Sequence, residues 1–261
     1  MSDIKIKSQE EISLMRESGQ LLAKVFGALD EVVQLGITTM EINDFVEDYI
    51  VITLNARPAS KGQYGYQYVL NSSINEVVCH GVPSHHKKLR NGDIVNIDIT
   101  LEKNGYIADS SKMYEIGSCS PIAKKLVAVT YEAMWKGIAC IKPGATTGDI
   151  GHAIQSYSEL NGFSVVREYC GHGIGQEMHE APQILHFGAP NSGITLEPGM
   201  TFTVEPMINQ GSYKTKQKKD GWTVITRDKK LSAQWEHTIL VTSDGYEVLT
   251  LRPEEKCLDG S

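Results

Sequence analysis

Four acidic residues and one histidine, widely separated along the chain, have the residue types of a metal centre. Carboxylates next to apolar runs are costly to bury unless they are paired or bound to metal. Such an oxygen-rich set could neutralise two divalent cations. It suits Mn, Fe, Co or Zn with open coordination positions, and not a structural thiolate zinc site. Paired metals ~3.5–4 Å apart can activate a water molecule and polarise a substrate oxygen. The five residues are Asp98, Asp109, His172, Glu205 and Glu236.

Asp98 and Asp109 are predicted to lie on one face of a β-hairpin. Asn104-Gly105, between them, is a strong signal for a two-residue turn. With these two residues as the loop, residue 100 faces Asp109, and Asp98 becomes the diagonal neighbour of Asp109, ~7–8 Å away at Cα. A pair of solvated edge charges is the alternative. It suits Asp109 better than Asp98, which stands between two isoleucines.

Glycines surround the candidate histidine in Gly171-His172-Gly173-Ile174-Gly175. They let the backbone and a ligand approach the imidazole closely, although an ordinary loop histidine is the alternative interpretation. A Ser-His-Asp hydrolase is disfavoured because the chain has no G-x-S-x-G motif. A phosphate-binding loop is also disfavoured, since Gly62-Gln63-Tyr64-Gly65 has the character of a flexible aromatic loop.

Hydrophobic periodicity predicts four helices that would position these residues. Capping boxes begin the first at Ser8 and the second at Thr38, and we expect these helices to end near Gly36 and Leu54. Ser120-Pro121 begins a third, to about residue 140, and the fourth covers about 148–160. A loop is expected over 56–73, and strands at 75–79, 94–101, 106–114, 163–169, 200–205, 222–227, 234–242 and 246–251. Because helices and strands mix without regular βαβ alternation, we expect an α+β fold.

Two segments recur in the same order along the chain. Residues 36–42 resemble 144–150, and residues 89–98 resemble 196–205, at offsets of 108 and 107 residues. The repeat predicts a single catalytic domain, residues 1–261, made of two related halves at about 1–115 and 116–261. It places Asp98 and Glu205 at equivalent positions, so packing of the halves would bring both carboxylates to a shared centre. Chance similarity of short turns is the alternative.

The composition is that of a globular protein without a broad basic surface. The chain has 261 residues, 41% of them hydrophobic, and a formal net charge of −7, which argues against DNA as a partner. No apolar run approaches the ~18 residues of a membrane span, and the first residues lack the apolar stretch of a signal peptide. We therefore expect a cytoplasmic chain. Its scattered cysteines predict reduced thiols, with neither a disulfide framework nor a zinc finger: Cys79, Cys119, Cys140, Cys170 and Cys257.

Taken together, the motifs resemble a bacterial type I methionine aminopeptidase, a peptidase family with the pita-bread fold. The segments that carry the resemblance span nearly the whole chain: NEVVCHGVP at 75–83, the Asp98/Asp109 pair, YCGHGIG at 169–175, MHE at 178–180, VEP at 204–206 and QWEHT at 234–238. The resemblance implies a pseudo-two-fold fold with a central antiparallel sheet flanked by helices. It also implies a dinuclear metal centre between the halves, and removal of the initiator methionine from new proteins whose second residue is small.

The resemblance further implies a role for each candidate metal ligand. Asp98 and Asp109 would hold one divalent ion, and His172 and Glu205 the other. Asp109 and Glu236 would bridge the two ions. Glu205 would also carry protons to and from the bridging water.

Other residues acquire implied roles around that centre. His80 and His179 would not bind metal but would hydrogen-bond the scissile amide and its transition state. A monovalent cation, Na or K, would be held through backbone oxygens at the positions of Asn75, Val77 and Ser232.

The pocket for the methionine side chain departs from the family pattern of apolar, aromatic and cysteine residues. Tyr66, Met178 and Trp222 would keep a soft apolar pocket. The polar residues would make its other wall polar and relax the demand for an apolar side chain; the alternative is that they point away into solvent. The pocket positions carry Ser60, Gln63, Tyr66, Asn71, Met178 and Trp222.

Rival interpretations differ in what they require of the chain. Prolidases and aminopeptidases P usually carry a large extra N-terminal domain. Type II methionine aminopeptidases carry a helical insertion in the second half, and metal-free adaptor relatives have lost metal ligands.

We expect a monomer that acts on the N-terminal methionine of nascent polypeptides. A basic cluster is proposed, by resemblance, to dock on ribosomal RNA; a solvated turn is the alternative. The cluster comprises Lys214, Lys216, Lys218 and Lys219. A second basic group, Arg227, Lys229 and Lys230, is expected at the same end of a hairpin.

Overall fold

The structure, a computed structural model, describes residues 4–255. This range contains four α-helices: α1 (Gln9–Leu29), α2 (Thr39–Asp48), α3 (Pro121–Ile138) and α4 (Thr147–Leu160). A π-helical segment (Tyr49–Thr53) continues α2, and Gln63–Gly65 forms a 3-10 turn. The predicted helix starts are confirmed, because Ser8, Thr38 and Ser120 each accept a hydrogen bond from the backbone N–H three residues on.

The first helix ends earlier than predicted, at Leu29 and not near Gly36. Asp30 and Glu31 follow its last turn, where negative charge is unfavourable next to the helix C-terminus. The chain turns there, and the Val33 N–H donates to the Leu29 carbonyl at 2.9 Å. Val33 still reaches the core from this turn, which accounts for the apolar periodicity beyond the helix.

Within the described part of the chain, the strand pairs are all antiparallel and fall into four sheets. One sheet joins β1 (Arg57–Pro58), β4 (Ile94–Lys103), β2 (Leu70–Ile74) and β5 (Tyr106–Glu115). The five-stranded sheet has the order β15 (Tyr246–Val248), β14 (His237–Val241), β9 (Thr201–Val204), β7 (Gly171–Gly173) and β8 (Glu180–Ile184). Smaller sheets join β13 (Ser232–Gln234), β10 (Met207–Asn209) and β6 (Ser164–Val165), and β11 (Thr215–Gln217), β12 (Val224–Thr226) and β3 (Val77–Cys79).

Several strand predictions were wrong in extent. The expected loop over 56–73 contains β1 and the start of β2, and β7, β8 and β10 were not predicted. The expected strand over 234–242 is interrupted at Trp235–Glu236, where Glu236 leaves the sheet to pair with Ser111 of β5. These strands are short, so neighbouring strands and not their own sequence pattern determine their pairing.

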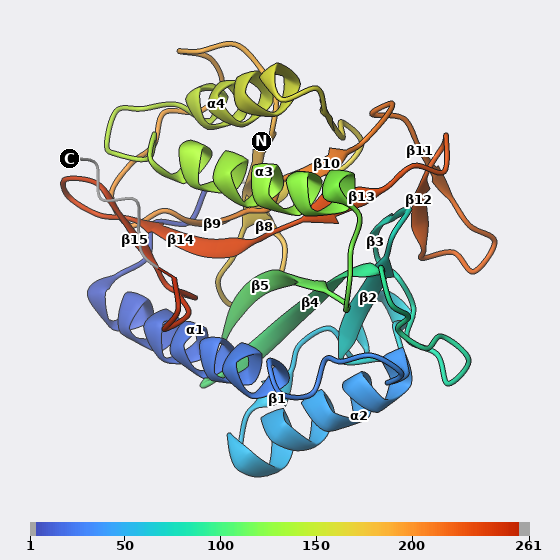
Figure 1. Cartoon of the computed structure of the whole chain (residues 1–261). Helices are drawn as coiled ribbons and strands as arrows, with labels where there is room; N and C mark the ends of the chain where they lie inside the picture. Colours follow the sequence, from blue (N-terminus) through green and yellow to red (C-terminus); the bar gives the residue numbers. More distant parts are fainter. Residues whose placement is uncertain (1–3, 256–261) are drawn as a thin grey trace.

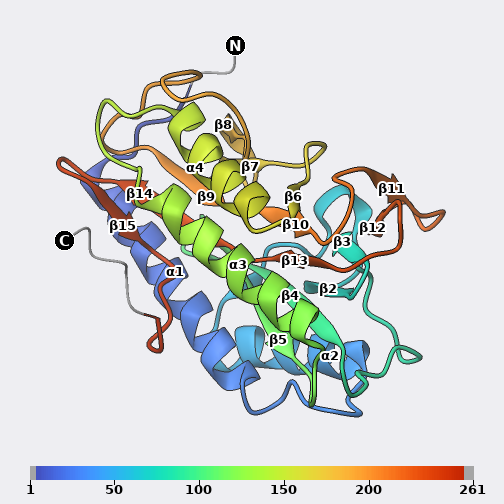
Figure 2. The same ribbon diagram turned by 45° about the horizontal axis from the view of Figure 1, so that its top comes forward.

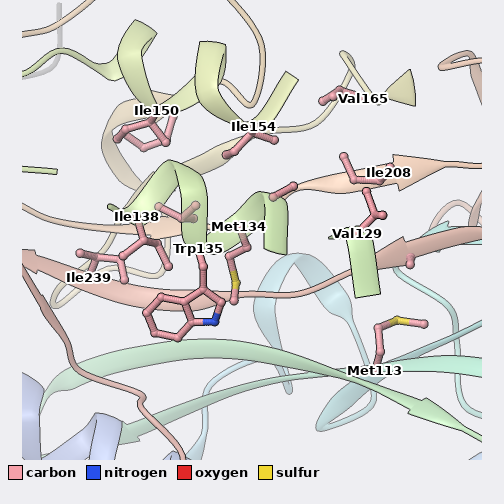
Figure 3. Packing of buried hydrophobic residues seen from close by; sticks show 14 of the residues in the cluster. Met113, Val129, Met134, Trp135, Ile138, Ile150, Ile154, Val165, Ile208 and Ile239 are labelled. Atoms are coloured by element: carbon pink, nitrogen blue, oxygen red, sulfur yellow. The ribbon is translucent and has the colours of Figure 1, made fainter. Parts of the chain in front are cut away.

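The helices cover the outside of the sheets. Figures 1 and 2 show α1 and α2 on one side, α3 and α4 on the other, and the strands between them. One core packs α1 and α2 against β4, and a second packs α3 and α4 against β9, β10 and β14. Figure 3 shows Trp135 and Met134 of α3 in this second core, with Ile154 of α4 and Ile239 of β14 nearby. The expected α+β architecture is confirmed.

The two segments of the suspected repeat make matching contacts. The Gly36 N–H donates to the Leu89 carbonyl at 2.9 Å, and the Gly144 N–H donates to the Leu196 carbonyl at 3.0 Å. Isolated antiparallel bridges follow the same rule, joining Thr38 to Lys88 and Thr146 to Thr195. The capping boxes at Thr38 and Thr146, which begin α2 and α4, are therefore each tied to the loop before a strand that leads to a candidate carboxylate, Asp98 or Glu205.

Candidate metal and active site

A single cavity of about 1260 Å³ collects every candidate metal, catalytic and pocket residue. Its lining includes side chains from both sides of the molecule, which the two helix-covered layers bring face to face. The candidates found there are Ser60, Gln63, Tyr66, Asn71, His80, Asp98, Asp109, His172, Met178, His179, Glu205, Trp222 and Glu236.

The β4–β5 hairpin has the predicted register. Thr100 pairs with Asp109 and Lys103 pairs with Tyr106, without a bulge between them. The backbone of Asp109 is held from the other layer, because its N–H donates to Thr238 Oγ1 at 3.0 Å and its carbonyl accepts from the same hydroxyl at 2.7 Å. The Asp98 Oδ2 accepts a hydrogen bond from Asn71 Nδ2 at 3.1 Å. The backbone of Asp109 and the carboxylate of Asp98 are thus each held by a neighbouring side chain.

His172, Glu205 and Glu236 come to the two aspartates from the second layer. His172 lies on β7, Glu205 follows the last residue of β9, and Glu236 lies in the break between β13 and β14. His172 Nε2 is 3.5 Å from Glu205 Oε1 and 3.9 Å from Asp109 Oδ2. Ligand atoms of Asp109, His172 and Glu236 all lie within 4.8 Å of one another.

Hydrogen bonds orient the Glu205 carboxylate within this group. Thr203 Oγ1 donates to its Oε1 at 2.7 Å, and Gln234 Nε2 donates to its Oε2 at 3.3 Å. Its backbone N–H donates to Nε2 of His186 at 3.1 Å. The side chain is therefore held from both oxygens and from the backbone.

The electrostatics of the cluster favour cations. Burial raises the pKa of Asp98 to about 6 and the pKa of Glu205 to about 8. Burial, followed by the charges of neighbouring carboxylates, raises the pKa values of Asp109 and Glu236 well above the ordinary range. Burial and the nearby His179 lower the pKa of His172 to about 3, which keeps its imidazole neutral and able to donate a lone pair.

The donor set fits divalent metal ions. Within residues 4–255, Asp109 Oδ1 is buried and has no hydrogen-bond partner, although an unpaired buried carboxylate oxygen is costly. Divalent cations would neutralise the repelling carboxylates and supply the missing partner. Mixed carboxylate and imidazole ligands suit Mn, Fe, Co or Zn.

Two histidines flank the cluster without belonging to it. The rings of His179 and His172 meet edge to face, with centroids 4.4 Å apart, and Tyr64 stacks with His179 at 6.1 Å. His80 follows β3 with a backbone φ of 54°, and its ring lies 5.6 Å from that of Tyr169. Both histidines line the cavity.

The residues expected to form the side-chain pocket line the cavity, and two of their polar groups already have hydrogen-bond partners. Tyr66 and Trp222 lie in contact, with ring centroids 4.9 Å apart, and Met178 is buried beside the same cavity. The Ser60 hydroxyl hydrogen-bonds the Thr100 hydroxyl. The Asn71 amide donates to Asp98, so these polar groups point at neighbours and not into open solvent.

Some residues around the site escaped the sequence reasoning. His186 is 1% exposed and supports the Glu205 backbone; the apolar run around it was the available signal of burial. Glu180, next to His179, forms an ion pair with Lys7 at 2.7 Å, and both side chains are almost fully buried. No local pattern indicates that pair, because its members are 173 residues apart.

The residues of the expected monovalent cation site lie near one another. The Asn75 carbonyl accepts a hydrogen bond from the Ser232 N–H at 2.9 Å, and Val77 pairs with Ile225 at the start of β3. None of the three lines the large cavity.

The basic segment forms the expected hairpin, but its charges are arranged differently. The Arg227 N–H donates to the Lys214 carbonyl at one end, while the Lys218 N–H donates to the Thr223 carbonyl near the tip. The prediction that both basic groups project from one end was therefore wrong. The antiparallel register places Lys218 and Lys219 at the tip, away from the Arg227 group, and all four lysines of the first cluster are exposed.

The structure describes four of the five cysteines, and none of these four forms a disulfide. Cys79, Cys119, Cys140 and Cys170 are free thiols, and Cys257 lies outside the described residues. Between residues 4 and 255, no helix combines the length and apolar character that crossing a bilayer requires.

Comparison with known proteins places this site in a family. The model of metallopeptidase family M24 matches residues 13–243. The chain is 50% identical over 252 residues to the methionine aminopeptidase of Salmonella typhimurium, covering 97% of this chain and 96% of the relative. It is also 50% identical over 254 residues to methionine aminopeptidase B of Synechocystis, covering 96% and 93%.

Solved structures agree with the sequence relatives. The methionine aminopeptidase of Rickettsia prowazekii superposes with a TM-score of 0.93 at 50% identity, over 95% of this chain and all of that one. A Xaa-Pro dipeptidase of Bacillus anthracis superposes with a TM-score of 0.76 at 27% identity, and this chain covers 63% of its length. The shared architecture confirms the pita-bread fold.

Proposed function

Because the chain belongs to metallopeptidase family M24, with methionine aminopeptidases as near full-length relatives, we propose that it removes the initiator methionine from nascent polypeptides whose second residue is small. One observation carries the proposal: the side chains of Tyr66, Met178 and Trp222 line the same cavity as the carboxylate and histidine cluster. The enzyme is therefore a metal-dependent aminopeptidase, a hydrolase of the first peptide bond.

Each residue contributes a defined function in this proposal. Asp98, Asp109, His172, Glu205 and Glu236 would hold two divalent ions. Such ions would supply an activated water and polarise the scissile carbonyl. His80 and His179 would donate hydrogen bonds to the amide and to its developing negative charge. Glu205, whose two carboxylate oxygens are both oriented by hydrogen bonds, would carry protons to and from the activated water.

Metal analysis combined with hydrolysis of Met-Ala-Ser tests the proposed function. We expect two divalent ions per chain, release of free methionine, and poor cleavage of Xaa-Pro dipeptides. Preferential cleavage of Xaa-Pro bonds, or no methionine release with Mn or Co supplied, would overturn it.

We also infer that residues 1–261 form one catalytic domain of two related halves, about 1–115 and 116–261. The matching contacts of the two capping boxes support this division. A monomeric state, a cytoplasmic location, the identity of the metal and a Na or K site at Asn75, Val77 and Ser232 stay predictions.

The polar residues lining the pocket are expected to influence which first residue of a peptide is cleaved. The double substitution Gln63→Tyr, Asn71→Cys should raise the preference for methionine over more polar first residues, because it replaces two polar lining groups. The measurement is kcat/KM over a panel of X-Ala-Ser peptides. The single variant Gln63→Tyr serves as a control, since Asn71 also holds Asp98. An unchanged ratio of methionine to other residues would show that these positions do not set selectivity.

We propose further that the β11–β12 hairpin contacts ribosomal RNA through Lys214, Lys216, Lys218 and Lys219. Exposed lysines along one strand and its tip could neutralise several phosphates, with an affinity that falls steeply with salt. The Lys214/Lys216/Lys218/Lys219→Ala variant should lose co-sedimentation with ribosomes at low salt and keep its peptide hydrolysis.

A charge-matched variant controls for this loss. Lys24, Lys124, Lys136 and Lys142 are exposed lysines outside the hairpin, and their replacement by alanine removes the same charge. Equal sedimentation of the hairpin variant and the parent would exclude the contact.

A further inference from the structure

The residues assigned so far occupy only part of the cavity. About 1260 Å³ exceeds the roughly 300–1,000 Å³ of an ordinary small-molecule site. A second wall has no assigned role: it is formed by the segment that follows His179 and by the first described residues of the chain. Its larger side chains are those of Ile4, Lys5, Gln183, Leu185, Phe187 and Ile194.

This second wall begins directly at the catalytic groups. β8 starts one residue after His179, and side chains alternate along it and beyond. Pro182, Ile184 and His186 are buried, whereas Gln183 and Leu185 are exposed. The exposed face of this segment therefore leads away from the scissile bond along the cavity.

Contacts with α4 hold the far part of the wall in place. The Thr147 N–H donates to the Ile194 carbonyl at 2.9 Å, and the Ile194 N–H donates to Thr147 Oγ1 at 3.1 Å. At Gly151 the segment approaches α4 so closely that a Cβ would lie 2.6 Å from the Phe187 carbonyl oxygen. The far part of the wall is thus held against α4, although it lies outside helices and strands.

The N-terminal segment is held against the same cavity from the other side. Lys7 pairs with Glu180 at 2.7 Å, and its N–H donates to the Gly199 carbonyl at 2.9 Å. Lys5 adds a second contact with Glu180 at 3.0 Å. Ile4 and Lys5 are thereby placed at the cavity.

Large apolar side chains are left exposed along this wall. Leu185 is 40% exposed and Ile194 is 38% exposed, and both line the cavity together with the exposed Tyr64. Single exposed apolar residues are ordinary, but several around one concave surface that continues from a catalytic centre indicate a binding site.

We propose that the wall of Leu185, Phe187 and Ile194 binds the substrate polypeptide beyond its third residue, and favours apolar side chains there. The inference rests on the proposed function, because a polypeptide cleaved after its first residue continues beyond the catalytic groups. The wall would thereby contribute to the choice among nascent chains, beyond the small second residue.

The experiment compares two pentapeptides, each relative to the same tripeptide. Substrates are Met-Ala-Ser, Met-Ala-Ser-Leu-Leu and Met-Ala-Ser-Ser-Ser, and the readout is the kcat/KM of each pentapeptide divided by that of Met-Ala-Ser. For the parent protein we expect the Leu-Leu ratio to exceed the Ser-Ser ratio by about tenfold, the size of effect that one or two apolar contacts produce. In the Leu185→Ser, Ile194→Ser variant this preference should disappear.

A matched control separates groove binding from general surface effects. Leu160, at the end of α4, is 84% exposed and lies outside the cavity lining, so Leu160→Ser should keep the preference of the parent. Equal ratios for the two pentapeptides in the parent, or an unchanged preference in the double variant, would overturn the groove. If the parent does not release methionine from Met-Ala-Ser, the proposed function itself fails, which is a distinct outcome.

Discussion

Replacing His172 by alanine is expected to lower kcat/KM for Met-Ala-Ser at least ~100-fold and to remove one or both metal ions. His172 is the one nitrogen ligand of the set, and its Nε2 lies within 4 Å of both Asp109 and Glu205. Its imidazole is neutral at neutral pH, so it can bind a metal ion without first losing a proton. In the alanine variant this ligand is missing and the mutually repelling carboxylates remain. Asp109→Ala should act in the same way, because it deletes a carboxylate that has a ligand atom within 4.8 Å of those of both His172 and Glu236.

The measurement is the metal content per chain after dialysis, together with peptide hydrolysis. His152→Ala is the matched control, because His152 is an exposed histidine on α4 outside the cavity lining. It should keep both metal and activity. Normal turnover by the His172 or Asp109 variant in metal-stripped buffer would contradict the dinuclear assignment.

His179→Ala should lower kcat and kcat/KM together by ~10²–10³, with the metal content unchanged. The imidazole lies beside His172 without being a ligand, so its loss removes a donor to the transition state and leaves the ligands in place. His80→Ala should behave similarly, since His80 faces the same cavity. Metal content must be measured in parallel because the His172 and His179 rings are in contact.

His179→Gln provides the matched comparison. Its amide retains a hydrogen-bond donor, so it should recover part of the rate that alanine loses. An increase in KM with unchanged kcat would show instead that His179 only binds the substrate.

Local sequence signals determined the helix starts and the central hairpin. Ser8, Thr38 and Ser120 accept the predicted capping hydrogen bonds because their side chains act on N–H groups three residues away. Asn104-Gly105 permits a two-residue turn, and that turn alone determines the pairing of residue 100 with Asp109. The chemistry of the candidate ligands was also readable from residue type and from the apolar runs beside them.

Tertiary structure decided how the short strands pair and where the carboxylates of the second half lie. β7, β10 and β11 are too short for a periodic pattern, and each exists because a neighbouring strand takes its hydrogen bonds. Glu236 was expected within a continuous strand. It lies instead in a break that pairs with Ser111 of the other layer, since the chain there passes from one sheet to another.

The long-range polar contacts depended on tertiary structure most of all. The buried pairs Lys7–Glu180 and His186–Glu205, and the bond from Asn71 to Asp98, join residues that no local spacing relates. The alternation of a single strand shows which side chains share a face, but not what lies opposite that face. The sequence therefore determines the residue types of the metal centre. The contacts that orient these residues, and the apolar wall of the cavity, arise only when the layers pack against each other.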